Sequence, residues 1–327
     1  MKTIRTFAIL LAGAAITLAA VPKTVPPQAP APNIAQWESV LAARERRANL
    51  IRDEIKAMDA RIEARGDALL ASLRSIGDSK DSRSKVARMK EETIQAIRRN
   101  IDYYRSKRAA LKEELRRPTL NLTVAEKRTM IASFDTRIEK RIGQILDLLK
   151  SLPTHKEYER YKVEGSTWAG PTYAVNEDYV QNQRLVTITN RLQREIEAGL
   201  RASIARLERE NKMLNAELQA SNYSSPKDLT GEIAKNEALI EERRNQISVV
   251  RSFVSTPTRK VSQREAIDFD HERNNTVAQL RLDFDNLFAR YNNLLPELSI
   301  INSTRSAIAA AKARALKATP TPAPASR

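Results

Sequence analysis

One stretch of the chain carries its apolar residues in mirror-image order, and this symmetry constrains the fold more than any other feature. From residue 181 to 256, apolar residues recur at alternating steps of four and three, the spacing of a coiled-coil seam. Leu218 with Leu229 and Leu207 with Ile240 are two of the matched pairs, and the residue numbers of each pair sum to 447. A constant sum is what an antiparallel fold-back requires. The pattern therefore predicts a helical hairpin over residues 181–256.

Two polar seam residues follow the same rule, because Asn211 and Asn236 also sum to 447. A polar residue in a seam fixes register and partner choice at some cost in stability. We therefore predict that these two asparagines face each other and set the register of the hairpin. One alternative is that both amides lie at a wet rim without a specific role. Another is a parallel dimer zipper through Leu207 to Leu218, which the matching return helix disfavours.

The N-terminal half shows the same spacing over three further segments. Pairs such as Leu69 with Ile94 and Ile62 with Ile101 sum to 163, which predicts a hairpin over residues 34–117 that turns near Asp81. Two arginines, Arg44 and Arg65, occupy seam positions of its first arm.

A third helix follows Pro118 in this half. It begins at Thr123-Val124-Ala125-Glu126, which has the form of a capping box. It ends before Pro153, and we expect it to lie along the first hairpin. Residues 34–152 are therefore predicted to form a three-helix coiled-coil bundle.

The remaining segments differ in composition. A final helical region is predicted over residues 257–318, and its seam continues through Pro296, which indicates a kink or a break and restart of the helix there. Residues 21–33 hold five prolines and are expected to form an extended linker. Residues 319–327 are a similar tail that we expect to be disordered.

Composition supports the same fold class. Charged residues make up 29% of the chain, aromatic residues 5%, and there are 8 glycines, the bias of long helices and coiled coils. We predict an all-α, elongated, antiparallel coiled-coil bundle of about six long helices. The chain has no cysteine, which excludes disulfides, and only two histidines, far apart in sequence, so no metal site and no cofactor are expected.

The first twenty residues have the order of a secretory signal peptide. A cationic start with Lys2 and Arg5 precedes an uncharged apolar run that ends in small residues. The run is shorter than the roughly 20 residues of a membrane-spanning helix. We predict cleavage after Ala20, or after Ala19, and export to a bacterial periplasm. The alternative is an inner-membrane protein anchored by an uncleaved N-terminal segment.

Aromatic residues gather in the connecting segment 153–180. They include Tyr158, Tyr161, Trp168, Tyr173 and Tyr179, among glycines and a proline. Aromatic side chains with a polar edge are frequent at recognition surfaces, so this segment is a candidate interaction site. The alternative is that these residues plug the end of the bundle. A short β-ribbon near residues 172–175 is only weakly indicated.

The charge of the chain is strongly positive. The formal net charge is +16, and removal of the signal with Lys2 and Arg5 lowers it by two, to +14. A basic balance favours anionic envelope polymers or lipid headgroups as contacts, whereas export disfavours nucleic acid. The competing interpretation is that the basic residues, interspersed with acidic ones, only solvate the helices and support ion pairs.

No catalytic motif stands out: neither a nucleophile elbow, nor a phosphate-binding glycine loop, nor a zinc-protease motif occurs. We therefore expect a non-enzymatic structural or adaptor protein of the cell envelope that binds protein partners or a second copy of itself. Two alternatives remain open. One is a periplasmic holdase-type chaperone, which this chain resembles in composition and architecture only. The other is a coiled-coil regulator of a cell-wall enzyme.

Overall fold

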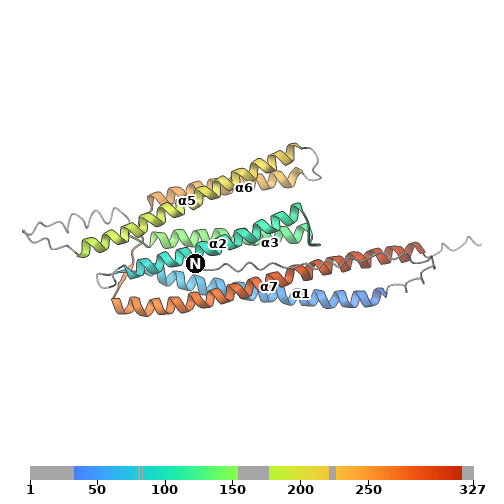
Figure 1. Ribbon diagram of the computed structural model, residues 1–327, viewed down its shortest axis with the longest axis horizontal. Coiled ribbons are helices and arrows are strands. Elements are labelled where there is room, and N and C mark those ends of the chain that lie inside the picture. The colour runs from blue at the N-terminus through green and yellow to red at the C-terminus, as the bar shows by residue number, and fades with distance from the viewer. Residues whose placement is uncertain (1–32, 80–81, 83, 154–176, 221–225, 319–327) are drawn as a thin grey trace, which may run out of the picture.

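The protein is an elongated bundle of helices (Figure 1). The computed structural model describes residues 33–79, 82, 84–153, 177–220 and 226–318. These residues form α1 (Ile34–Ser75), β1 (Ile76–Asp78), α2 (Lys85–Arg116), α3 (Val124–Lys150), α5 (Glu177–Gln219), α6 (Pro226–Ser252), β2 (Arg259–Val261) and α7 (Gln263–Ala318). The predicted all-α class is confirmed. The predicted signal peptide, residues 21–32 of the predicted linker and the C-terminal tail lie outside the described residues, whereas Asn33 is the N-cap of α1.

The helices are arranged as three antiparallel pairs that stack in layers. α1 packs along α7, α2 along α3, and α5 along α6. The α2/α3 pair forms the middle layer, with α5/α6 on one side and α1/α7 on the other (Figure 1). Contacts between layers are sparser than contacts within each pair.

The α5/α6 pair is the hairpin predicted from the mirror-image seam. Leu207, Leu214, Leu229 and Ile240 are all buried along it. α6 begins at Pro226, where the missing N–H of proline removes no helical hydrogen bond. The register matches the sequence pattern, because the side chains of Asn211 and Asn236 meet across the pair.

The prediction that α1 and α2 form a hairpin is wrong, because each of them packs mainly against another helix. α1 lies closest to α7, and ion pairs such as Glu38–Lys312 and Glu45–Arg305 run along the contact. α1 and α2 share the central core, through residues such as Ile62 and Ile97. They are separated widely enough that neither is the other's main neighbour. The three-helix bundle predicted over residues 34–152 is thus completed by a fourth helix from the C-terminal end.

α2 and α3 form a hairpin that is not predicted by the sequence, and its second arm begins at the capping box that is predicted. The amide of Glu126 donates to Thr123 Oγ1 at 3.1 Å, and the Thr123 amide donates to Glu126 Oε2 at 2.8 Å. This reciprocal capping box satisfies amides that the first helical turn leaves without partners.

α7 is one helix of 56 residues that runs through Pro296. Of the two predicted alternatives at this proline, the break and restart is therefore absent, and the kink stays a prediction. Its start is capped in the same way as that of α3. The Glu265 amide donates to Ser262 Oγ at 3.2 Å, and the Ser262 amide donates to Glu265 Oε2 at 2.8 Å.

A short parallel ribbon of β1 and β2 ties the end of α1 to the start of α7. Ile76 pairs with Arg259, Gly77 with Lys260 and Asp78 with Val261. No such ribbon is predicted by the sequence, where Gly77-Asp78-Ser79 is a helix stop. The ribbon requires glycine at position 77, since a Cβ there would lie 2.2 Å from Thr258 Oγ1.

An aromatic cluster lies in the core where α2, α3 and α7 meet. Aromatic rings from all three helices stack there, and Tyr103 and Phe288 have ring centroids 4.0 Å apart. Tyr104 is fully buried, with its ring 5.4 Å from that of Phe284 and 5.9 Å from that of Phe134. These edge-to-face and tilted contacts bind the middle layer to α7.

The ribbon contact gives a direct test of the fold. We expect Gly77→Ala to destabilise the protein by about 1–3 kcal/mol, because the new methyl group overlaps Thr258. Gly231→Ala is the matched control, since its Cβ would meet nothing within 4 Å on α6, and helix propensity should stabilise it by about 1 kcal/mol. Urea unfolding of both variants measures the difference. Equal stability of the two would contradict the close approach of Gly77 to Thr258.

Candidate functional site

The structure describes only part of the predicted site. Ala20 and four of the five candidate interaction aromatics, Tyr158, Tyr161, Trp168 and Tyr173, lie outside the described residues. Tyr179 lies in the first turn of α5, but its side chain is not described. The weakly indicated ribbon at residues 172–175 also lies outside. Cleavage, and the role of the aromatic segment, therefore stay predictions.

The two seam asparagines are brought together. Asn236 is 3% exposed, and its Nδ2 donates to Asn211 Oδ1 at 2.8 Å. Any shift of one helix along the other would separate these amides and bury Asn236 without this partner. The geometry fits the predicted role in register, which remains a prediction until stability and pairing are measured.

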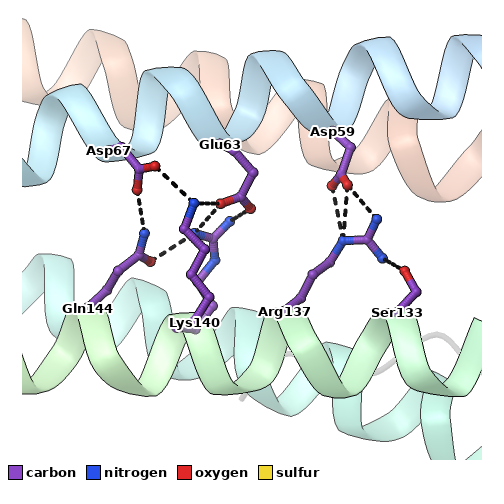
Figure 2. A network of polar contacts seen from close by, with 8 residues as sticks. Asp59, Glu63, Asp67, Ser133, Arg137, Lys140 and Gln144 are labelled. Atoms are coloured by element: carbon purple, nitrogen blue, oxygen red, sulfur yellow. Dashed lines mark hydrogen bonds and ion pairs between the residues drawn. The ribbon is translucent and has the colours of Figure 1, made fainter.

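Polar contacts join α1 to α3 across the boundary between two layers. Figure 2 shows the network, in which Asp59, Glu63 and Asp67 of α1 face α3. Arg137 donates through Nε to both carboxylate oxygens of Asp59 at 3.1 and 3.2 Å, and Arg141 Nη2 donates to Glu63 Oε1 at 2.5 Å. Asp59–Arg137 and Glu63–Arg141 are each 78 residues apart, so the two helices run parallel.

The network continues toward the end of α1. Gln144 Nε2 donates to Asp67 Oδ1 at 2.8 Å, and Lys140 Nζ lies 2.5 Å from Glu63 and 2.9 Å from Asp67. Arg141 is 5% exposed and holds the centre of this network. Its charge is compensated by Glu63 and its Nη1 donates to Gln144 Oε1 at 2.8 Å.

Similar ion pairs join the middle layer to α5/α6. α2 contacts α5 through Arg98–Glu195, Glu91–Arg191 and Lys112–Glu210, and α3 contacts α6 through Asp135–Lys235 and Glu139–Arg243. Several basic side chains are crowded at this boundary. Burial, together with the neighbouring charges of Arg105 and Arg108, lowers the pKa of Arg206 to about 10. Carboxylates placed among these cations hold the layers in one relative position.

A buried lysine joins three chain segments at the end of the bundle. Lys90, near the start of α2, is 1% exposed. Its Nζ donates to the carbonyl oxygen of Ile76 at 2.6 Å and to that of Ser151 at 2.8 Å. Ile76 is the C-cap of α1 and Ser151 is the C-cap of α3. The amine therefore satisfies carbonyls at two helix C-termini, where positive charge is favoured.

Asp78 makes the complementary contact at the start of α2. Its carboxylate accepts from the amides of Val86 at 3.1 Å and Ala87 at 3.0 Å, and from Ser82 Oγ at 3.2 Å. Burial raises the pKa of Asp78, and the two amide hydrogen bonds oppose this shift. Asp78 thus caps α2 from the ribbon side, while Ser84 adopts a left-handed conformation with φ of 61°.

The sequence analysis predicts no role for Lys90, although the position of this lysine carries a signal. It lies three residues after Ala87 and four before Ile94, which makes it a seam position of α2. A lysine in an apolar seam needs acceptors, and here the two C-terminal carbonyls supply them. Its pKa is lowered by burial to about 7, with Asp78 raising and Lys260 lowering it. A neutral amine still carries two N–H groups, enough for both carbonyls.

A cavity of about 350 Å³ adjoins this junction, between Asp78, Lys90, Thr256 and Lys260. The connection between α6 and β2 completes its wall. The Thr256 amide of this connection donates to the Lys150 carbonyl oxygen at the end of α3, at 2.7 Å. The Lys90 amine is buried and already donates to two carbonyl oxygens. The geometry is therefore that of a structural junction between chain segments. α3 ends here, so the aromatic segment 153–180 begins at this end of the bundle.

The described residues hold neither a metal-binding cluster nor a membrane-spanning helix. Among them, no three His, Cys, Asp or Glu side chains gather closely enough to hold a metal ion. No helix in the described ranges is long and apolar enough to cross a membrane. Comparison with protein-family models, with curated proteins and with solved structures gives no match.

The α1/α3 network gives a testable energetic claim. We expect Glu63→Gln to destabilise the protein by about 3 kcal/mol, because it leaves the charge of buried Arg141 without its carboxylate. Asp53→Asn is the matched control on the same helix, since Asp53 and its partner Lys56 are largely exposed, and its unfolding midpoint should not move. Guanidinium unfolding measures both. An unchanged stability of the Glu63→Gln variant would show that the network does not hold the layers together.

The buried lysine makes stability depend on pH. Between pH 7 and 10 the unfolded chain binds a proton at Lys90 that the folded protein has released, so the free energy of unfolding should rise with pH. One proton sets a limit of about 1.4 kcal/mol per pH unit. Lys90→Met removes this titration and should flatten the dependence. Urea unfolding at pH 7, 8 and 9 compares the two proteins, and parallel curves would contradict the lowered pKa.

Proposed function

We propose that the protein is an exported, non-enzymatic scaffold or adaptor of the cell envelope, which presents the 153–180 segment to a protein partner. The observation that carries the proposal is the ion-paired stacking of three helix pairs. Such layers give a long body of defined shape, and α3 ends at one end of it. A segment that follows directly on such a helix suits a binding role, because binding residues are often carried on loops that a rigid scaffold supports.

The same observation favours a scaffold over a holdase chaperone. A holdase must offer adaptable apolar surface to many unfolded clients. Here the apolar seams are buried between paired helices, and the boundaries between layers are rich in ion pairs. The large apolar side chains that are exposed, such as Leu50, Val254 and Leu316, belong to different helices or connections.

Export and partner binding are tested together by photo-cross-linking in bacterial cells that produce the full chain. A photoreactive amino acid at Trp168 should give one discrete adduct, whereas the same group at Asn215, exposed on α5, should give none. The exported chain should begin at Val21 or Ala20 when its N-terminus is sequenced.

The outcomes separate the alternatives. A ladder of diffuse adducts from position 168, with suppression of aggregation of an unfolded outer-membrane protein, would favour the holdase. An adduct with a cell-wall hydrolase would favour the regulator. An intact N-terminus in the membrane fraction would favour the anchored form. A cytoplasmic chain without any adduct would contradict the proposal.

A further inference from the structure

A second and larger cavity lies between the α1/α7 layer and the α2/α3 layer. Its volume is about 530 Å³, and residues from α1, α2, α3 and α7 line it. This volume is within the range of small-molecule sites, which are commonly 300–1,000 Å³ and mainly apolar. Its described lining includes no residue of the 153–180 segment.

The wall of the cavity is apolar on three helices. Ile62 and Leu69 come from α1, Ile97 from α2, and Leu280 and Phe284 from α7. Protein interiors are close-packed, so the apolar side chains that face this open cavity make fewer contacts than they would in a filled core. An apolar occupant would restore these contacts.

A glycine opens the cavity from the α1 side. Gly66 lies in the interior of α1 and lines the cavity, and a Cβ built on it would meet nothing within 4 Å. Glycine in a helix interior costs about 1 kcal/mol relative to alanine. No close approach of backbone requires glycine at this position, in contrast to Gly77. The space in front of Gly66 is therefore available to a ligand.

The rim of the cavity is positively charged. Arg99 of α2 and Arg281 of α7 are exposed there, with one carboxylate, Asp285. In the part of the chain that the structure describes, neither guanidinium has an ion-pair partner. Two further polar side chains of the wall have partners, because Arg141 pairs with Glu63 and Gln144 donates to Asp67. The net positive charge is thus at the entrance and the apolar surface is inside.

We infer that this cavity binds a single-chain amphiphile with an anionic head, of the fatty-acid class. The acyl chain would lie against the apolar wall in front of Gly66, and the carboxylate would lie between Arg99 and Arg281. This binding is independent of the scaffold role and would add a ligand to it.

The test uses the full mature chain and isothermal titration with dodecanoate below its micellar concentration. We expect one site per chain. Gly66→Leu should fill the cavity and weaken binding by roughly tenfold or more. Gly231→Leu, at a glycine with open space on α6, is the matched control and should bind as the parent does. Circular dichroism and the melting temperature check that both variants are folded.

The head group is tested separately. Replacing both Arg99 and Arg281 by glutamine should weaken dodecanoate by roughly three- to tenfold and leave dodecan-1-ol unchanged. Equal loss for both ligands would overturn the assignment of the head group. Binding of dodecanoate that Gly66→Leu leaves intact, or no binding to the parent protein, would overturn the site. Tight binding to vesicles of an anionic two-chain phospholipid, without binding of dodecanoate, would also overturn it.

Discussion

The packing of the first long helix against the last is the interaction on which the architecture depends. α1 and α7 are the outer elements of the described chain, and they close the bundle from opposite ends of the sequence. Their contact is antiparallel, with Glu38 opposite Lys312 near one end and Arg65 opposite Asp283 farther along. The β1/β2 ribbon fixes the other end of the pair. Without this closure, the apolar faces of α1 and of the middle layer would be open to water.

Two kinds of interaction stabilise this architecture, one within the helix pairs and the other between them. Within each pair of helices, apolar seams supply most of the burial and hence the driving force for folding. Between pairs, carboxylates and guanidinium groups meet at a nearly constant sequence offset and fix one relative position. Desolvation offsets much of the Coulomb energy of such buried pairs, so their main contribution is to exclude other arrangements. The space left between layers, in front of Gly66, follows from their wider separation.

The sequence was sufficient for local pairing and insufficient for distant pairing. The α5/α6 hairpin could be predicted because its arms adjoin in sequence and carry one uninterrupted mirror pattern through Asn211 and Asn236. The same test failed for α1, since a seven-residue repeat gives near-constant sums with several helices. Arg44 and Arg65 held the missing information: both are seam arginines, and both find carboxylates on α7, at Glu297 and Asp283. The junction at Lys90 needed the positions of two helix ends, which no local pattern contains.

The closure of the bundle is measured most directly by zero-length carbodiimide cross-linking of the unmodified chain, followed by mass spectrometry. Lys312 Nζ lies 2.7 Å from Glu38 Oε1, and both side chains are about half exposed and open to the reagent. We expect an amide link between these two residues within a single monomeric chain. Links that join residues 34–75 mainly to residues 85–116, or a Lys312–Glu38 link found only in dimers, would contradict the three-layer bundle.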